Sequence, residues 1–190
     1  ASRDLSTLGP AVQQLKNADL HCFDQMFTIE DITAKCRTLH QQQALDLIVV
    51  DYLQLIDTKG TGNANRAVEV GQYSRALKML AMQLGCPVLL LSQLNRNVET
   101  RPDKRPLMAD LRESGSVEQD ANKVVMIYRD EVYNEQTPDI GVAELILRKH
   151  RGGPVGTRRC AGNLRCFRFE DLAHDHQQQQ VQGGSNDPFA

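Results

Sequence analysis

The sequence contains no tryptophan, and aromatic residues make up only 5% of its 190 residues. With so few rings, we expect stacking on nucleic-acid bases to contribute little to any function of the chain. No run of about 18 apolar residues and no basic-then-apolar leader occurs, so the sequence predicts neither membrane insertion nor export. The five cysteines include no C-x-x-C pair. They predict buried, reduced thiols in a cytoplasmic protein rather than a zinc site or a disulfide framework.

An excess of positive charge is also lacking. The formal net charge is −2, so any contact with DNA must come from a local cluster of cations. A further absence is the loop G-x-x-x-x-G-K-[ST], which cradles the phosphates of ATP. The nearest glycine-rich segment, residues 152–157, lacks the Lys-Ser/Thr ending. We therefore expect the chain alone neither to bind nor to hydrolyse ATP appreciably.

Length and hydrophobic periodicity predict one α/β domain with parallel strands. Four apolar runs predict strands, the last three of them buried, at residues 20–23, 45–51, 87–91 and 124–128. Two helices are predicted, one from a capping box at residues 28–31 to polar residues 41–43 and one over residues 70–84, ended by Gly85. The remaining expectations are loops at 58–65 and 96–108, a hairpin over 158–169 turning near Gly162-Asn163, and disorder from residue 174.

Polar residues end two of the predicted parallel strands. Asp51 closes the run 45–51, and Gln93 follows the run 87–91. The carboxyl ends of parallel strands form the edge at which α/β sheets bind ligands. A lone acid there often positions the magnesium ion of a nucleoside triphosphate. Taken alone, a strand-ending aspartate such as Asp51 is more often a turn or helix-cap residue, and an isolated glutamine such as Gln93 is usually an ordinary surface residue.

A long collinear set of motifs resembles the DnaB-type replicative DNA helicases, over about residues 20–172. The motifs are LDLIVVDYLQLI (45–56), YSRALKMLA (73–81), PVLLLSQLNRNVETRPDKRPLMADLRESGSVEQDA (87–121), KVVMIYRDEVY (123–133), KHRGGPVGT (149–157) and FRFEDL (167–172). The resemblance implies a RecA-like P-loop NTPase core with a central, mostly parallel sheet, truncated at its N-terminal side. Residues 1–172 would be a partial motor domain and 173–190 a disordered Gln/Gly-rich tail. The phosphate-binding loop and catalytic glutamate of the family lie upstream, so a cut domain, a truncated chain and a degenerate gene product all remain open.

The resemblance also implies roles for four residues in hydrolysis of ATP with Mg²⁺. Asp51 matches the acid that positions the metal, and Gln93 matches an amide that senses the γ-phosphate. Lys149 and Arg151 match a pair that reaches across a subunit boundary in a hexameric ring. Both could point to one side, because they alternate at the end of a strand. A solvated basic strand end is the alternative interpretation.

Contact with DNA is expected at residues 112–115. The candidate residues are Arg112, Glu113 and Gly115, because a glycine at positive φ would let successive backbone amides approach a phosphate closely. A turn between helices, with Ser116 capping the second, suits the same residues. Four further cations could contribute or could belong to a solvated loop, namely Arg96, Arg101, Lys104 and Arg105.

The leading hypothesis is part of a homo-hexameric, ATP-driven helicase that translocates on single-stranded DNA, with primase and a helicase loader as candidate partners. A non-enzymatic DNA-binding or oligomerisation module is the alternative, because the phosphate-binding loop is absent. A recombinase or clock-type ATPase of RecA-like fold is disfavoured by the motif at residues 110–115 and by KHRGGP.

Overall fold

The computed structural model describes residues 8–25, 28–56, 66–111 and 115–172. The predicted loop 58–65 and the tail from residue 174 therefore lie outside the described residues. The α-helices are α1 (Leu8–Asn17), α2 (Ile29–Gln42), α3 (Arg66–Leu84) and α4 (Gly115–Asp120). The strands are β1 (Ile48–Val50), β2 (Val88–Leu90), β3 (Lys123–Tyr128), β4 (Val142–His150), β5 (Gly156–Asn163) and β6 (Arg168–Asp171). Short 3-10 turns are η2 (Leu53–Leu55), η4 (Arg96–Thr100), η5 (Met108–Asp110) and η6 (Asp130–Val132).

Helix α2 begins at the predicted capping box. The Thr28 hydroxyl accepts a hydrogen bond from the Asp31 backbone N–H at 3.2 Å and donates one to the Asp31 carboxylate at 2.6 Å. This satisfies an N–H group that the first turn would otherwise leave unpaired. The helix ends at Gln42, and Gln43 caps it through its N–H to the Leu39 carbonyl. Both predicted ends of this helix are confirmed.

Helix α3 carries the main apolar stripe of the chain. Val70, Tyr73, Leu77 and Leu80 are all buried, at the helical spacing predicted from the sequence. They pack in one core with residues of α2 and the β1–β2 pair. Gly85 ends the helix at φ +62°, a conformation that glycine adopts at little cost. The predicted helix and its glycine stop are confirmed.

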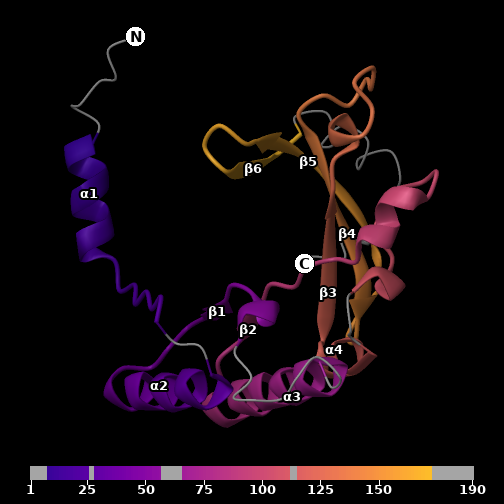
Figure 1. Cartoon of the computed structure of the whole chain (residues 1–190). Coiled ribbons are helices and arrows are strands. Elements are labelled where there is room, and N and C mark those ends of the chain that lie inside the picture. The colour runs from indigo at the N-terminus through magenta and orange to yellow at the C-terminus, as the bar shows by residue number, and fades with distance from the viewer. Residues whose placement is uncertain (1–7, 26–27, 57–65, 112–114, 173–190) are drawn as a thin grey trace.

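The strands form two sheets rather than the predicted central, mostly parallel sheet. β1 and β2 are parallel, with Ile48 opposite Val88, whereas β3, β4, β5 and β6 form an antiparallel sheet in that order. Figure 1 shows the long antiparallel strands rising from α4, with α2 and α3 along one side of the molecule. The described residues are thus mixed α/β with a single parallel pair, and the expectation of a mostly parallel sheet is wrong for them.

The hairpin predicted over residues 158–169 is β5–β6. Its turn lies later than expected, because Gly162 pairs with Phe169 and Asn163 with Arg168. The reversal therefore takes place over residues 164–167, where Phe167 adopts φ 51°.

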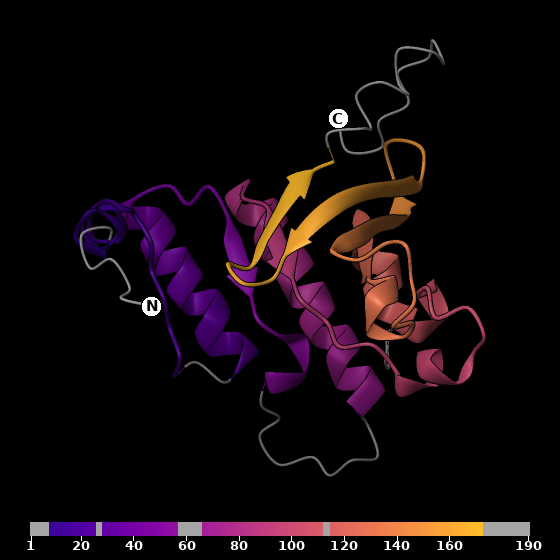
Figure 2. The same ribbon diagram turned by 90° about the horizontal axis from the view of Figure 1, so that it is seen from above.

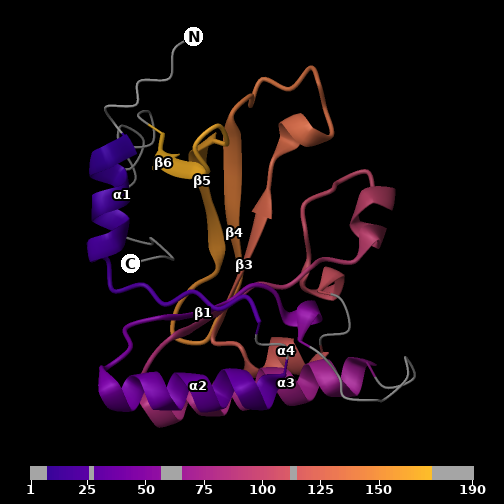
Figure 3. The ribbon, with the colours of Figure 1, turned by 60° about the vertical axis from the view of Figure 1, so that its left-hand side comes forward.

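Strand burial also differs from the prediction of strands covered on both faces. In β1, Ile48 and Val50 are buried, whereas Val49 is 54% exposed, and β3 alternates in the same way. Helices α2 and α3 lie along one face of the β1–β2 pair, as Figures 2 and 3 show, whereas Val49 and Leu89 on the opposite face are each 54% exposed. One-sided cover explains why these apolar runs alternate between buried and exposed.

Residues 20–23 do not form the predicted strand. They run as irregular backbone after α1, and Leu20 is 64% exposed. The segment has a short local bond from the Leu20 N–H to the Ala18 carbonyl and no described strand beside it. A strand needs a hydrogen-bonding neighbour, so an apolar run alone does not produce one.

The cysteines are free thiols that differ in burial. All five cysteines are free; Cys36, Cys86 and Cys160 are buried, whereas Cys22 and Cys166 are exposed. Burial raises the pKa of the three buried thiols, which keeps them protonated.

Among the described residues, no helix has the length and apolar character that a membrane crossing requires.

Candidate nucleotide site and cation pair

Asp51 and Gln93 lie at the same edge of the parallel pair. Asp51 follows Val50 directly, and Val50 pairs with Leu90 in the neighbouring strand. Backbone pairing continues beyond the two strands. The Leu91 N–H donates to the Val50 carbonyl and the Leu53 N–H donates to the Leu91 carbonyl, each at 3.0 Å. Both Asp51 and Gln93 are exposed. The structure therefore brings these two predicted residues to one solvent-facing edge.

Gln54 joins the two chain segments at this edge. Its Nε2 donates to the Ser92 hydroxyl at 3.1 Å, and its Oε1 accepts from the Gln93 backbone N–H at 3.2 Å. One amide thus fixes the backbone that presents the Gln93 side chain. Sequence reasoning missed this role, although Gln54 stands three residues after Asp51 within the apolar motif and is the polar residue of η2.

The edge fits a magnesium–nucleotide complex better than a protein-only metal cage. No group of three His, Cys, Asp or Glu side chains suited to a metal gathers within the described ranges. Mg²⁺ is commonly held by one or two carboxylates, with water and substrate phosphate oxygens completing its octahedron. Asp51, as an exposed carboxylate at the strand ends, suits that role. The bound ion would neutralise phosphate charge, while Asp51 would orient it.

Lys149 and Arg151 form a cation pair at the far end of β4. Lys149 Nζ donates to the carbonyls of Glu118 and Gln119, and Arg151 Nη2 donates to the Gln119 carbonyl. The Arg151 backbone N–H donates to the Asn122 carbonyl at 3.0 Å. Both side chains reach the last turn of α4, so the prediction that they share one side is confirmed. No described hydrogen bond or ion pair links them to Asp51 or Gln93.

Gly115 is the first residue of α4, and its φ is not positive. The expectation of a left-handed turn at this glycine is wrong, because the backbone has already entered the helix. A Cβ added to Gly115 would meet no atom within 4 Å. Ser116 lies inside the helix and does not cap it. Arg112 and Glu113 lie outside the described residues.

The predicted basic loop is tied to acidic and aromatic neighbours. Arg101 contacts both carboxylate oxygens of the buried Asp110, at 2.8 and 2.6 Å, and these bonds hold the pKa of Asp110 below its ordinary range. Arg105 contacts both oxygens of Glu144 at 2.8 Å, which raises the pKa of Arg105.

The other two cations of the loop differ. Lys104 donates to the Arg101 carbonyl at 3.2 Å and lies 5.6 Å from the ring centre of Tyr133. Arg96 opens η4 and is exposed. Three of the four loop cations thus have internal partners, and their contact with DNA remains a prediction.

The geometry defines a class of protein before any relative is considered. A carboxylate and an amide at the carboxyl ends of adjacent parallel strands, backed by two helices, are typical of nucleotide-binding α/β domains. Residues 1–171 match the family described as DnaB-like helicase C terminal domain. The chain therefore belongs to this family.

Similar proteins agree with that assignment. The chain is 44% identical over 183 residues to the replicative DNA helicase DnaB of Geobacillus stearothermophilus, covering 96% of this chain and 40% of that protein. It is 50% identical over 147 residues to the DnaB of Pasteurella multocida, covering 77% and 31%. The chain thus spans well under half the length of these curated relatives.

Solved structures show the same fold. One of them, described as an ATPase domain, superposes with a TM-score of 0.84 at 37% identity, covering 90% of this chain and 61% of that one. A DnaB-like replicative helicase, solved in a study of its interactions with primase, gives the same TM-score and identity and is covered over 42% of its length. The RecA-like ATPase fold expected from the sequence motifs is therefore confirmed.

Proposed function

We propose that this chain is part of the ATP-hydrolysing motor of a hexameric replicative helicase that translocates on single-stranded DNA and unwinds duplexes. One observation carries the proposal: Asp51 and Gln93 share the carboxyl edge of β1 and β2, and Gln54 ties the two segments together. Family membership supports the same function.

In this proposal Asp51 positions Mg²⁺ on the β- and γ-phosphates of ATP. Gln93 donates its amide to a γ-phosphate oxygen and loses that partner after hydrolysis. Such a neutral sensor needs a fixed backbone and an exposed side chain. The Gln54 side chain holds the Gln93 backbone N–H, and the Gln93 side chain stays exposed. The phosphate cradle and the group that activates water would come from polypeptide outside these 190 residues.

Lys149 and Arg151 act on the nucleotide of a neighbouring subunit. Their contacts support this role. Both side chains donate to carbonyls of α4, and no described hydrogen bond or ion pair links them to Asp51 of their own chain. A guanidinium supplied in trans stabilises the charge that develops on the transferred phosphoryl group and is worth roughly 10³–10⁵ in rate in comparable enzymes. A ring assembled from this chain would place one such pair at every interface.

The DNA contact is proposed at residues 112–115, with Arg96, Lys104 and Arg105 as additional cations. Backbone amides would hold phosphates without regard to sequence, as a translocating motor requires. Primase is a candidate partner because one solved relative was studied with primase. We also propose a helicase loader as a partner and the cytoplasm as the location of the protein.

A second candidate function depends on whether the native protein carries a phosphate-binding loop outside these 190 residues. If the native protein has no G-x-x-x-x-G-K-[ST] upstream of Ala1, the chain is better suited to a DNA-binding or oligomerisation module without its own ATPase activity.

The test compares the 190-residue chain with the complete protein in magnesium-dependent ATP hydrolysis, with and without single-stranded DNA. We expect no turnover by the chain and DNA-stimulated turnover by the complete protein, abolished by Asp51→Asn. Turnover by the chain alone that Asp51→Asn abolishes would contradict the proposed division of the site. A complete protein that binds DNA but never hydrolyses ATP would favour the module.

A further inference from the structure

The two cations of the proposed pair lie on either side of His150. Strand β4 ends at His150, and a turn over residues 151–155 carries Arg151 and leads into β5. The imidazole reaches across this turn, because its Nδ1 atom lies 3.3 Å from the Pro154 carbonyl oxygen. The residue between Lys149 and Arg151 therefore contacts the turn on which Arg151 stands.

Gly153 makes room for this imidazole. A Cβ added to Gly153 would lie 2.8 Å from both the Nδ1 and the Cε1 atoms of His150, closer than real Cβ atoms come to other heavy atoms. The φ of Gly153 is not positive, so its backbone conformation does not favour glycine over other residues. Close packing against the ring is therefore the reason for a glycine at this position.

A β-bulge sets the direction of Lys149. Leu147 pairs with Val125, whereas Lys149 pairs with the preceding residue of β3, Val124, so β4 has one extra residue, Arg148. Neighbouring residues of β3 point to opposite faces, and their partners Leu147 and Lys149 therefore do so as well. The strand thus orients Lys149, whereas Arg151 lies beyond the strand and depends on its turn.

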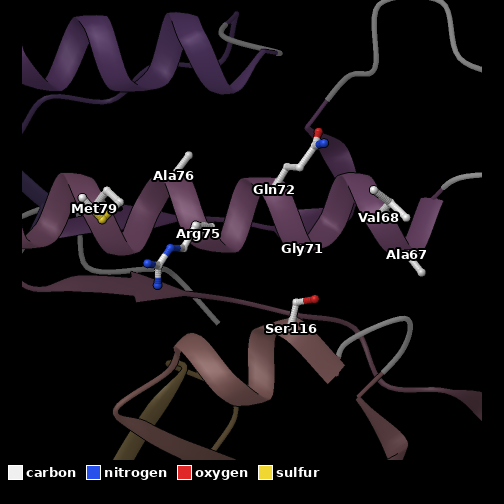
Figure 4. Close-up of a pocket in the computed structure, with 8 residues that line it drawn as sticks. All are labelled: Ala67, Val68, Gly71, Gln72, Arg75, Ala76, Met79 and Ser116. Atoms are coloured by element: carbon white, nitrogen blue, oxygen red, sulfur yellow. The ribbon is translucent and has the colours of Figure 1, made fainter.

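The backbone partner of Arg151 is itself held by α3. The Arg151 N–H donates to the Asn122 carbonyl at 3.0 Å, and Lys78 donates to the Asn122 side chain at 2.7 Å. Helix α4, which precedes Asn122, packs closely on α3. Figure 4 shows Ser116 of α4 pointing toward α3 near Gly71, beside a groove of about 710 Å³, and a Cβ at Gly71 would lie 2.6 Å from the Ser116 Oγ. Since this support is fixed, the remaining freedom of Arg151 lies in its own turn.

We propose that His150 is a positioning residue, which orients Arg151 toward the nucleotide of the neighbouring subunit. The imidazole packs on Gly153 and restricts the turn, while the Asn122 carbonyl holds the Arg151 N–H. The Arg151 side chain donates through Nη2 to the Gln119 carbonyl, and a guanidinium has five N–H donors, so donors remain for a phosphate. A guanidinium that is already oriented loses less freedom when it meets the transferred phosphoryl group. The inference rests on the proposed helicase function, and it adds a residue on which the action of Arg151 depends.

The first experiment measures kcat for ATP and nucleotide affinity of the complete protein with single-stranded DNA. His150→Ala should lower kcat by about tenfold and leave nucleotide affinity within about twofold of wild type, because only the orientation of Arg151 is lost. His150→Phe keeps a ring against Gly153 and should recover most of the rate. Val155→Ala, which shortens an exposed side chain of the same turn, is the matched control and should leave kcat unchanged.

Gly153→Ala tests the contact from its other side. The added methyl group would displace the imidazole, so this variant alone should also lower kcat. In the His150→Ala background it should have no further effect, because the atoms that it would meet are gone. Gly152→Ala is the control, since a Cβ there lies 3.9 Å from the ring, an ordinary contact. Independent losses that add up in the double variant would overturn the proposal.

Mixed rings show on which subunit the loss falls. Asp51→Asn subunits should not hydrolyse ATP but should still present Arg151 to wild-type neighbours. Adding His150→Ala to the Asp51→Asn subunits should lower hydrolysis by the wild-type subunits mixed with them, and unchanged hydrolysis would overturn the proposal. A complete protein in which Arg151→Ala leaves kcat at the wild-type value would instead overturn the proposed function, so the two failures are distinguishable.

Discussion

Gln54 and Gln93 are joined by a hydrogen bond from the Gln93 backbone N–H to the Gln54 side-chain oxygen, at 3.2 Å. The same amide donates to Ser92, so it holds two consecutive residues beyond β2. The Gln93 side chain stays exposed and available to a ligand. This pairing converts two polar residues, 39 positions apart, into one structural unit.

Gln54→Ala should therefore impair the proposed sensor without touching nucleotide. Loss of its hydrogen bonds frees the backbone at Gln93, and we expect kcat of the complete protein to fall about tenfold, equivalent to about 1.4 kcal/mol. Nucleotide affinity should change much less. Steady-state hydrolysis and a nucleotide titration measure both quantities, with Gln72→Ala on the exposed side of α3 as control. A variant with wild-type kcat would show that Gln54 does not position Gln93.

The elements predicted best are those fixed by local chemistry. The Thr28–Asp31 cap, the stripe on α3 and the Gly85 stop depend on residues within a few positions of one another. Strand pairing depends on distant partners, so residues 20–23 and the mostly parallel sheet were predicted wrongly. An apolar run shows that burial is favourable, but it does not say which strand lies beside it.

The candidate site likewise combines residue positions that the sequence predicted with contacts that it did not. Strand-end positions predicted that Asp51 and Gln93 share an edge, because the parallel order of β1 and β2 follows from the helix between them. The contacts of Gln54, and those of Lys149 and Arg151 with α4, were not predictable, since they join side chains to backbone atoms of remote segments. No pattern of residue types encodes a carbonyl as a partner.

Asp110 should make stability depend on pH. Its pKa is held below the ordinary range by hydrogen bonds from Arg101. The unfolded state therefore takes up its proton first, so the contribution of this group is complete above about pH 4–5 and is lost as the pH falls through the folded-state pKa. Urea unfolding of the chain at pH values from 7 to about 3 measures this dependence.

Asp110→Asn cannot titrate and leaves Arg101 facing a neutral amide. We expect a less stable chain at pH 7 and a smaller decrease in stability on acidification. Asp103, Asp130 and Glu131 also have lowered pKa values, so some decrease remains. Asp139→Asn, in the partly exposed pair with Arg159, is the control. An unchanged pH profile in Asp110→Asn would show that the Arg101 contact contributes nothing to folding.

Arg151→Ala should abolish DNA-stimulated hydrolysis in the complete protein, lowering kcat by about a thousandfold, while nucleotide still binds. The loss falls on kcat because the guanidinium stabilises charge that develops only during transfer. Arg159→Ala on β5 serves as a surface control. Mixing Arg151→Ala with Asp51→Asn subunits should restore partial activity at interfaces that pair two intact halves. Near-normal turnover, or no recovery on mixing, would contradict action across subunits.

Gly115→Val should weaken single-strand binding equally for oligonucleotides of unrelated sequence. The added side chain would stand where a phosphate is proposed to approach the backbone. A Cβ at Gly115 meets no protein atom within 4 Å, so the start of α4 has room for the first carbon of a side chain. A reduced affinity would then reflect a blocked approach, and Gly115→Ala should give a smaller loss.

Arg112→Ala separates backbone contacts from side-chain contacts at the same segment. If backbone amides make the main contact, this variant should lose less affinity than Gly115→Val, and the salt dependence of binding should change only slightly. Fluorescence anisotropy of labelled oligonucleotides over a salt series, on correctly assembled protein, measures both quantities. Unchanged affinity in Gly115→Val would move the site to the basic loop, first to Arg96, because Arg101, Lys104 and Arg105 already have internal partners. A loss confined to some sequences would argue against a translocating motor, which must hold every sequence it passes over with similar strength.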